Sequence, residues 1–551
     1  MRPSRTLYLM ACTTFLFLLP LNAQQTDTPG AQGGSDSSAQ PPQDQRSLAD
    51  IARGLRKNQQ AEVRMTPADA KALFALVDKI TDFVTHDTDL PRKAPVKRRL
   101  VGQADVEKFF REKTAKTEYA QRFARAELTM KKFGLLPRDF DLRGFLVQAN
   151  GQQVAGFYDD DSKVISMLNW IPLDQQEPIL AHELTHALQD QNYDLKNWAK
   201  AGLHRPDPRR PKQFVLDDEE SQSARHAVAE GQGMVVYFDY MLAPMGRTLK
   251  DTPGIIASME DPSVSAVIDT PIMHNAPIVL RESGAFPYRD GLLFEAALLQ
   301  RGGKKMAFSG ALTNPPRNSH EVLQPEAYLA SEKPSRVRMP DVRPLVAEKY
   351  ELYDSGGFGE LDVRILLKQL GEKRVAADLA MAWDGGAYVA FRPANPMPEL
   401  LGPGNAADVA LLYVSHWKTP EAAQKFAKAY TAGVARRYKN AELQRIPACT
   451  GNCPTMTSEW TTEEGPVIVE QWADNTVLVS ESFDDKTAAR LRNAVLDSSS
   501  AQTAGNFSTD ELSLRLYWLP AFREFQDRLR SQVLAAMSAS LQKAGTVKSG
   551  E

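Results

Sequence analysis

The chain has 551 residues, of which 42% are hydrophobic and 25% charged, a balance that excludes a wholly disordered, collagen-like or multi-span membrane protein. Its 66 lysines and arginines against 69 aspartates and glutamates leave a net charge of -3, with no basic excess for nucleic acid phosphates. With only three cysteines there is no Cys-rich zinc ribbon, so a metal site would have to use histidines and carboxylates.

Residues 1–23 are predicted to be a secretory signal peptide. Arg2 and Arg5 precede an apolar run from Leu7 to Leu21, and the small residue Ala23 closes the segment. An uncleaved membrane anchor is the alternative, although the run is shorter than the roughly 20 residues of a spanning helix. We therefore expect an exported protein, periplasmic or secreted, with no stable membrane insertion after signal removal.

Residues 24–47 hold no aromatic side chain and no aliphatic one larger than alanine, which predicts a disordered tether. Beyond it, apolar residues at helical spacing predict four helices: Thr66–Val84, Asp105–Phe133, Asp174–Gln191 and Ser221–Met241. Between the second and third of these, alternating apolar residues around turn signals predict a strand meander: Phe145–Val147, Val154–Tyr158 and Lys163–Leu168.

The pattern changes after Pro340. Gly356-Gly357 and Gly385-Gly386 punctuate a stretch that is predicted to be helical. After it, the pattern predicts three strands and one helix: strands Asp408–Trp417, Pro466–Gln471 and Thr476–Phe483, and helix Pro420–Tyr438. The expected fold class is α+β, with a domain over residues 48–345, a smaller α+β module over 346–500 and a C-terminal helical segment over 501–551.

Cys449 and Cys453 are the cysteines that remain after the signal peptide. They lie on either side of Gly451, and an oxidising compartment would favour a disulfide between them. Two free thiols are the alternative.

One motif carries metal chemistry. His182-Glu183-Leu-Thr-His186 places two histidines four residues apart in a helical pattern, so both imidazoles lie on one helix face and can reach a single ion. Glu183, next to the first histidine, can reach a water on that ion. A surface helix that happens to carry two histidines is the alternative interpretation.

A catalytic zinc site needs a third protein ligand. Glu230 is the predicted one, because a carboxylate among alanines and before Gly-Gln-Gly is costly to bury without a partner. His226, one helical turn earlier on the same face, is the rival ligand.

The segments HELTHALQDQ (182–191), AVAEGQG (227–233) and FPYRDG (286–291) carry a family resemblance. The first is similar to the active-site helix of thermolysin-like zinc peptidases, the gluzincins, and together they look like a group of exported bacterial proteins with the same His-Glu-x-x-His core. Two features depart from thermolysin. The interval from His186 to Glu230 is 44 residues, which is longer, and Met234 stands where the family has an acidic residue that orients a ligand histidine.

The resemblance implies a zincin-like metallopeptidase domain with bound Zn²⁺ and a peptide or protein substrate. It also implies that Glu183 is the general base of peptide hydrolysis, that Tyr288, His320 or His274 stabilises the oxyanion, and that Val154–Tyr158 pairs with substrate. The alternative is an exported binding or envelope-assembly protein with a vestigial or structural zinc site. A structural site, however, has no use for a carboxylate beside its first ligand. Neither cleavage specificity nor oligomeric state follows from the sequence.

Overall fold

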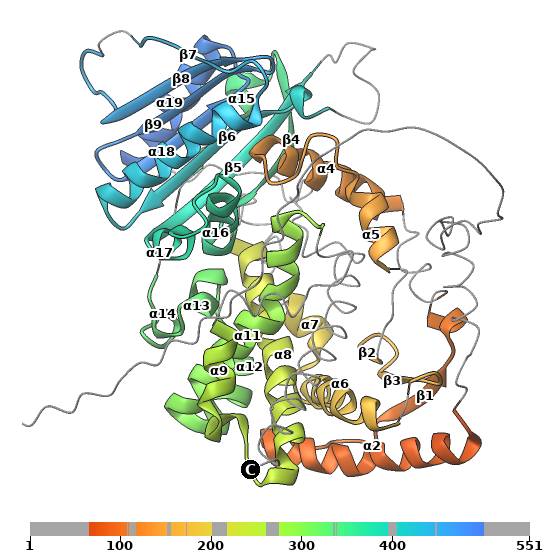
Figure 1. The fold of residues 1–551 in the computed structure, drawn as a ribbon. Coiled ribbons are helices and arrows are strands. Elements are labelled where there is room, and N and C mark those ends of the chain that lie inside the picture. The colour runs from red at the N-terminus through yellow and green to blue at the C-terminus, as the bar shows by residue number, and fades with distance from the viewer. Residues whose placement is uncertain are drawn as a thin grey trace, which may run out of the picture. The chain divides into compact units, whose positions relative to one another are not determined.

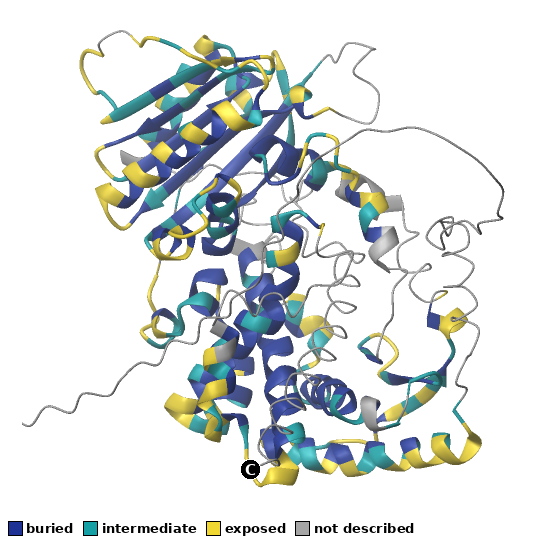
Figure 2. Cartoon of the chain, viewed as in Figure 1, coloured by how far each residue is buried: buried dark blue, intermediate teal, exposed yellow. Residues whose placement is uncertain are grey.

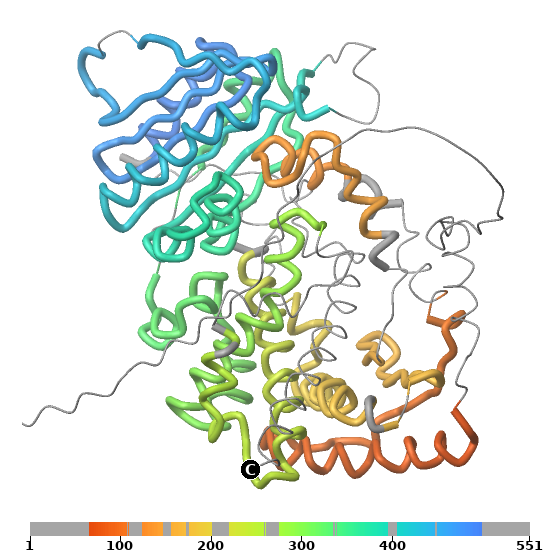
Figure 3. Tube along the Cα trace, viewed as in Figure 1, coloured from red at the N-terminus to blue at the C-terminus, as the bar shows by residue number. Residues whose placement is uncertain are grey.

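The computed structural model describes residues 65–500, except residues 107, 109–116, 151–155, 172, 201–216, 261–274, 334–336, 338, 395–404 and 447–448. These residues belong to one compact unit, Val63–Glu551. The predicted signal peptide, the 24–47 tether and the 501–551 segment lie outside the described residues. The fold is α+β, as predicted, with helices and two sheets (Figures 1 and 3).

The smaller sheet has three strands in the order β1-β3-β2. Strand β1 (Lys97–Val101) pairs in parallel with β3 (Val164–Leu168), and β2 (Phe157–Asp159) pairs with β3 in the antiparallel sense. The predicted strand at Lys163–Leu168 is therefore confirmed as β3. The predicted strand at Val154–Tyr158 overlaps β2, which is an edge strand, while residues 151–155 lie outside the described part of the chain.

Three of the four predicted helices appear with nearly the expected bounds: α2 (Pro67–Thr88), α6 (Leu173–Tyr193) and α8 (Asp217–Leu242). Helix α2 begins where the sequence indicates, because the Thr66 hydroxyl accepts a hydrogen bond from the Asp69 amide and the Thr66 amide donates to the Asp69 carboxylate in return. Of the remaining predicted helix, Asp105–Phe133, the structure confirms the part from Thr117 to Phe133 as α4, and residues 103–106 are also helical, while residues 107 and 109–116 lie outside the described part of the chain.

The predicted strand at Phe145–Val147 is wrong, because these residues lie in helix α5 (Leu142–Asn150). Leu142 and Leu146 are both buried and lie four residues apart, so the apolar period here is helical rather than alternating. Helix α11 (Ile278–Lys305) was not predicted at all. Its interior contains Pro287 and several glycines, residues that ordinarily disfavour a helix.

Helices α8 and α11 pack closely, because glycines meet at their contact. A Cβ atom on Gly231 would lie 2.3 Å from the backbone oxygen of Gly291, and one on Gly291 would lie 2.2 Å from that of Ala227. Only residues without a side chain permit this approach.

Apart from α8 and α11, the other helices between α6 and residue 330 that the structure describes are short: α7 (Leu195–Lys200), η1 (Ala243–Met245), η2 (Leu249–Asp251), α9 (Pro253–Glu260), η4 (Met306–Gly310, a π-helix), α12 (Ala311–Thr313), α13 (Ser319–Leu323) and α14 (Pro325–Leu329).

The larger sheet has seven strands in the order β4-β5-β6-β10-β9-β8-β7. All its neighbouring strands are antiparallel. The strands are β4 (Tyr350–Gly357), β5 (Trp383–Pro393), β6 (Ala410–Trp417), β7 (Glu442–Leu443), β8 (Met456–Thr462), β9 (Gly465–Gln471) and β10 (Thr476–Glu481). Its helices are α15 (Arg343–Val346), α16 (Glu360–Gln369), α17 (Ala376–Ala380), η6 (Ala406–Asp408), α18 (Pro420–Arg437) and α19 (Asp485–Ser500). Figure 2 shows that most of its central strands are buried.

The predicted helical stretch between the two glycine pairs is confirmed as α16 and α17, but strands β4 and β5, which contain the glycines, were not predicted. Gly356-Gly357 ends β4, and Gly385-Gly386 lies in β5 at a register shift, where Gly385 has φ +130°. A Cβ atom on Gly386 would lie 2.6 Å from the Phe358 carbonyl oxygen. These glycines therefore mark a bulge and a close backbone approach within strands. The other predicted elements of this module are confirmed as β6, β9, β10 and α18.

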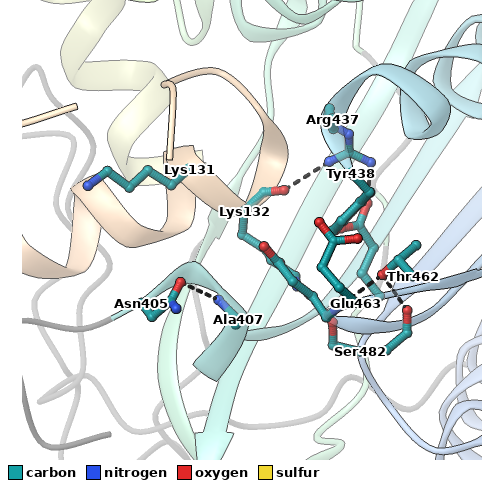
Figure 4. Close-up of polar contacts among 12 residues, drawn as sticks. Lys131, Lys132, Asn405, Ala407, Arg437, Tyr438, Thr462, Glu463 and Ser482 are labelled. Carbon is teal, nitrogen blue, oxygen red and sulfur yellow. Dashed lines mark hydrogen bonds and ion pairs between the residues drawn. The ribbon is translucent and has the colours of Figure 1, made fainter. Parts of the chain in front are cut away.

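Helix α4 is joined to the larger sheet by a buried charge cluster (Figure 4). The fully buried Lys132 ammonium donates to Glu464 Oε2 (2.9 Å) and Ser482 Oγ (2.7 Å), and Arg437 donates to the Lys132 carbonyl oxygen (2.9 Å). The neighbouring Phe133 stacks on Phe358 with ring centroids 4.9 Å apart. Helix α4 therefore packs with the seven-stranded sheet, although it precedes residue 345 in the chain.

The disulfide expected from the sequence is confirmed. Cys449 and Cys453 form a disulfide, with Cα atoms 5.9 Å apart.

No helix in the described part of the chain combines the length and the apolar character needed to cross a membrane.

Candidate metal centre

Two helices bring the predicted ligands together. His182 and His186 lie one turn apart on α6, and their Nε2 atoms are 3.0 Å from each other. Glu230 comes from α8, and its Oε2 lies 3.1 Å from His182 Nε2 and 3.4 Å from His186 Nε2. All three residues are buried. The apolar residues of α6 at Leu180, Leu184, Ala187 and Leu188 are also buried, which holds the helix in place.

The spacing of the three ligand atoms fits one small ion. Ligands bound about 2.05 Å from a tetrahedral ion are about 3.3 Å from one another. The observed separations of 3.0, 3.1 and 3.4 Å lie close to this value. Two imidazole nitrogens and a carboxylate oxygen are all electron-pair donors, so a cation or shared protons must lie between them. This group of His182, His186 and Glu230 can therefore hold a metal ion.

The environment of Glu230 favours its charged form. Burial opposes ionisation, but the electrostatic interaction with His186 and hydrogen bonds with His182, His186 and His226 hold the pKa of Glu230 well below its usual value. His226 Nε2 lies 3.3 Å from Glu230 Oε1, the oxygen that is not shared with the other two histidines. His226 is thus placed to orient the Glu230 carboxylate, while the ligand-type contacts belong to Glu230 itself.

A glycine makes room for the first ligand. Gly233 lies on α8 opposite His182, and a Cβ atom there would be 2.6 Å from His182 Cε1 and 2.7 Å from Nδ1. Distances below 3.0 Å are essentially absent from real structures, so any side chain at this position would displace the imidazole. The Gly-Gln-Gly sequence after Glu230 therefore serves packing at two points: Gly231 against α11 and Gly233 against His182.

Glu183 is held beside this group by the edge strand. Its carboxylate is buried, and its Oε2 accepts a hydrogen bond from the Tyr158 backbone amide at 2.8 Å. The other end of Tyr158 is fixed as well, since its hydroxyl donates to Asp190 Oδ2 on α6 at 2.7 Å. Asp190 also accepts from Lys163 Nζ (2.6 Å) and from the Leu195 amide (3.0 Å). Strand β2 is therefore fastened to α6 at two points, one of which is Glu183.

The second histidine of this group is oriented by a glutamine that was not among the predicted site residues. His186 Nδ1 lies 2.9 Å from Gln189 Oε1, and Gln189 Nε2 donates to Gln232 Oε1 at 2.8 Å. Both glutamines are fully buried. The sequence could have indicated both glutamines. Gln189 falls one helical turn after His186, and Gln232 lies between the two glycines that follow Glu230.

The predicted oxyanion residues are not all brought to the centre. His320 Nδ1 is paired closely with Glu360 of α16, and the preceding Ser319 donates to Glu220 near the start of α8. Glu220 and Glu230 are ten residues apart on one helix, which is about 15 Å along its axis. His320 is therefore held at the contact with α16 instead of beside the metal ligands.

Tyr288 lies buried within α11, three residues before the glycine that meets α8. It thus lies in the helix that packs on the ligand helix, and its oxyanion role stays a prediction. His274 lies outside the described residues.

The match to a known protein family lies over the larger sheet. A family model described as a domain of unknown function (DUF8575) matches residues 348–492, which run from β4 into α19 and exclude the metal ligands. No curated protein and no solved structure matches the chain. The function must therefore be argued from the chemistry of the metal centre.

Proposed function

We propose that the protein is an exported zinc-dependent endopeptidase of the gluzincin type. The observation that carries this proposal is a metal centre with three protein donors and an adjacent glutamate. Among the described residues, the group around His182 has three members, whereas structural zinc sites are closed by four protein ligands. Three donors leave one coordination position for water or substrate, which is the arrangement of catalytic zinc sites.

The donor set also favours zinc over other ions. Two imidazoles and one carboxylate are ligands that zinc accepts in a tetrahedral geometry, while calcium and magnesium prefer oxygen ligands in larger number. The disulfide between Cys449 and Cys453 supports export, because such bonds persist in oxidising compartments.

When bound, zinc would supply Lewis-acid activation of a water and of the scissile carbonyl group. The remaining chemistry belongs to Glu183, whose carboxylate is fixed by the Tyr158 amide at 2.8 Å. It takes the proton of the attacking water as the oxygen–carbon bond forms, and it returns that proton to the amine nitrogen as the carbon–nitrogen bond breaks. The buried position of Glu183 keeps bulk water away from this transfer.

Strand β2 supports a peptide substrate in particular. It is one of the two outer strands of the three-stranded sheet, and its Tyr158 amide donates to the proposed base directly. An extended peptide that adds to a sheet edge is bound through main-chain hydrogen bonds. A substrate aligned in this way along β2 would have its backbone next to Glu183.

The test is a paired measurement on Glu183→Gln. This substitution keeps the size of the side chain and its acceptor for the Tyr158 amide but removes the base, so zinc content and thermal stability are expected to match wild type. Hydrolysis of a quenched peptide library should fall about a hundredfold to ten-thousandfold. Equal rates for variant and wild type would refute the proposed role of Glu183. A wild type that holds zinc but cleaves no peptide would instead favour the binding-protein alternative.

A further inference from the structure

We propose that Gln189, Gln232 and the π-helix η4 form a relay that fixes the tautomer of His186, so that its Nε2 lone pair always faces the metal position. This inference rests on the proposed metal site but assigns residues that are not ligands. The relay runs from η4 (Met306–Gly310) through α8 to α6.

The outer end of the relay is made of backbone carbonyl groups. Gln232 Nε2 donates to the carbonyl oxygens of Ala307 (2.8 Å) and Phe308 (3.1 Å). Carbonyl oxygens can only accept, so the amide nitrogen of Gln232 must face them and its Oε1 must face the other way. Both residues belong to the π-helix, a rare form that often occurs at functional sites.

The middle of the relay is fixed by the same reasoning. Gln189 Nε2 donates to the Ala229 carbonyl oxygen (3.1 Å) and to Gln232 Oε1 (2.8 Å), which uses both of its hydrogens. The Ala229 carbonyl is again an acceptor only, so the orientation of the Gln189 amide is determined. Its Oε1 is left as an acceptor for the histidine.

The inner end sets the state of the ligand. Gln189 Oε1 lies 2.9 Å from His186 Nδ1, and an amide oxygen cannot donate, so the proton of the neutral ring must be on Nδ1. His186 Nε2 then carries the lone pair and points toward His182 Nε2 and Glu230 Oε2. A hydrogen bond on the far nitrogen is how proteins commonly orient a metal-binding histidine.

The relay is electrically neutral, whereas a negatively charged carboxylate often orients a metal-binding histidine in other proteins. Both of its side chains are amides, and the nearby Glu295 is fully buried on α11, where burial raises its pKa well above the usual value. Burial therefore favours the neutral form of Glu295. Glu230 supplies a carboxylate oxygen within 3.4 Å of both ligand imidazoles.

The first test observes the tautomer in the metal-free protein. With only 8 histidines in the chain, ¹⁵N-labelled histidine and long-range ¹H–¹⁵N correlation spectra at pH 8 can distinguish Nδ1–H from Nε2–H rings. Wild type is expected to show His186 protonated at Nδ1, and Gln189→Met should lose this preference. A predominant Nε2–H form of His186 in wild type would overturn the relay.

The second test measures Zn²⁺ affinity by competition with a chelator. Gln189→Met should weaken binding about 10- to 100-fold, as is typical when such an orienting partner is removed. Gln232→Met should weaken it less, since the Ala229 carbonyl still holds Gln189. The matched control is Gln176→Met on the same helix, a buried glutamine whose hydrogen bonds go to Leu168 and Ile171.

The outcomes separate the relay from the proposed function. Wild-type affinity in Gln189→Met, or an equal loss in the Gln176→Met control, would refute the relay. If Gln189→Met does not fold, Gln232→Met decides by the same two measurements. If wild type binds no Zn²⁺, the proposed function fails, while the tautomer measured in the metal-free protein still decides whether the relay exists.

Discussion

Gly233→Ala adds one methyl group to the helix that carries Glu230. The added Cβ atom would lie 2.6 Å from His182 Cε1, whereas ordinary van der Waals contacts begin at 3.4 Å. The imidazole would therefore have to move by about 0.8 Å, the difference between these two distances. Plausible metal–ligand distances vary by only about 0.2 Å, so the metal geometry cannot absorb a shift of this size.

Two effects on stability oppose each other in this variant. Replacing a helical glycine by alanine gains about 0.5–1 kcal/mol of helix stability, and overpacking a buried contact costs about 1–3 kcal/mol. The metal-free variant should therefore lose no more than about 2.5 kcal/mol. Its affinity for Zn²⁺, by contrast, should fall by at least the 10- to 100-fold typical of a disturbed ligand orientation.

The assay compares three alanine variants by chelator competition and by urea unfolding of the metal-free protein. Gly254→Ala on α9 is the control for helix propensity, because nothing lies within 4 Å of its added Cβ. Gly231→Ala is the control for overpacking against backbone instead of a ligand ring, since its Cβ would meet the α11 backbone at 2.3 Å. It should destabilise the fold more than Gly233→Ala does, because a backbone cannot rotate away as a side chain can.

The result that would refute this reasoning is wild-type Zn²⁺ affinity in Gly233→Ala. It would mean either that His182 has room to move without leaving the ion or that the ion does not bind at His182. A similar loss of affinity in Gly254→Ala would also refute it, because that variant changes helix propensity alone.

Two further predictions concern buried acids. Glu230→Gln should weaken Zn²⁺ binding by more than a hundredfold, as expected for the loss of a ligand. His226→Ala should weaken it by at most about tenfold, as expected for the loss of an orienting partner. Calorimetry measures both affinities, and the reverse order would make His226 the ligand. Burial raises the pKa of Asp239 to about 7 and that of Asp87 to about 6, and the charge of Asp87 adds to the rise at Asp239. Since these folded-state values exceed the ordinary 3.8, the pair lowers the free energy of unfolding as pH rises from about 4 through 7. Asp239→Asn should flatten this decline in urea titrations, and an unchanged pH profile would contradict the assignment.

Local patterns were enough to predict much of the fold. The helices α2, α6 and α8 and the strand β3 follow from apolar periodicity and capping residues, which act within a few positions of the chain. The predictions failed where glycine and proline signals were ambiguous. Gly385-Gly386 lies in a bulged strand, and α11 continues through Pro287, because neighbours distant in sequence stabilise both.

The sequence by itself determined the pair His182 and His186 and the place of Glu183 beside it. Four residues make about one helical turn, so any helix with this sequence presents both imidazoles on one face. The tertiary structure alone decided the rest of the centre. Glu230 and His226 also lie one turn apart on one helix, and only the crossing of α8 over α6 determines which of them meets the two histidines. Gln189 depends in the same way on carbonyl groups that other helices supply, because hydrogen bonds between helices are set by packing and not by local spacing.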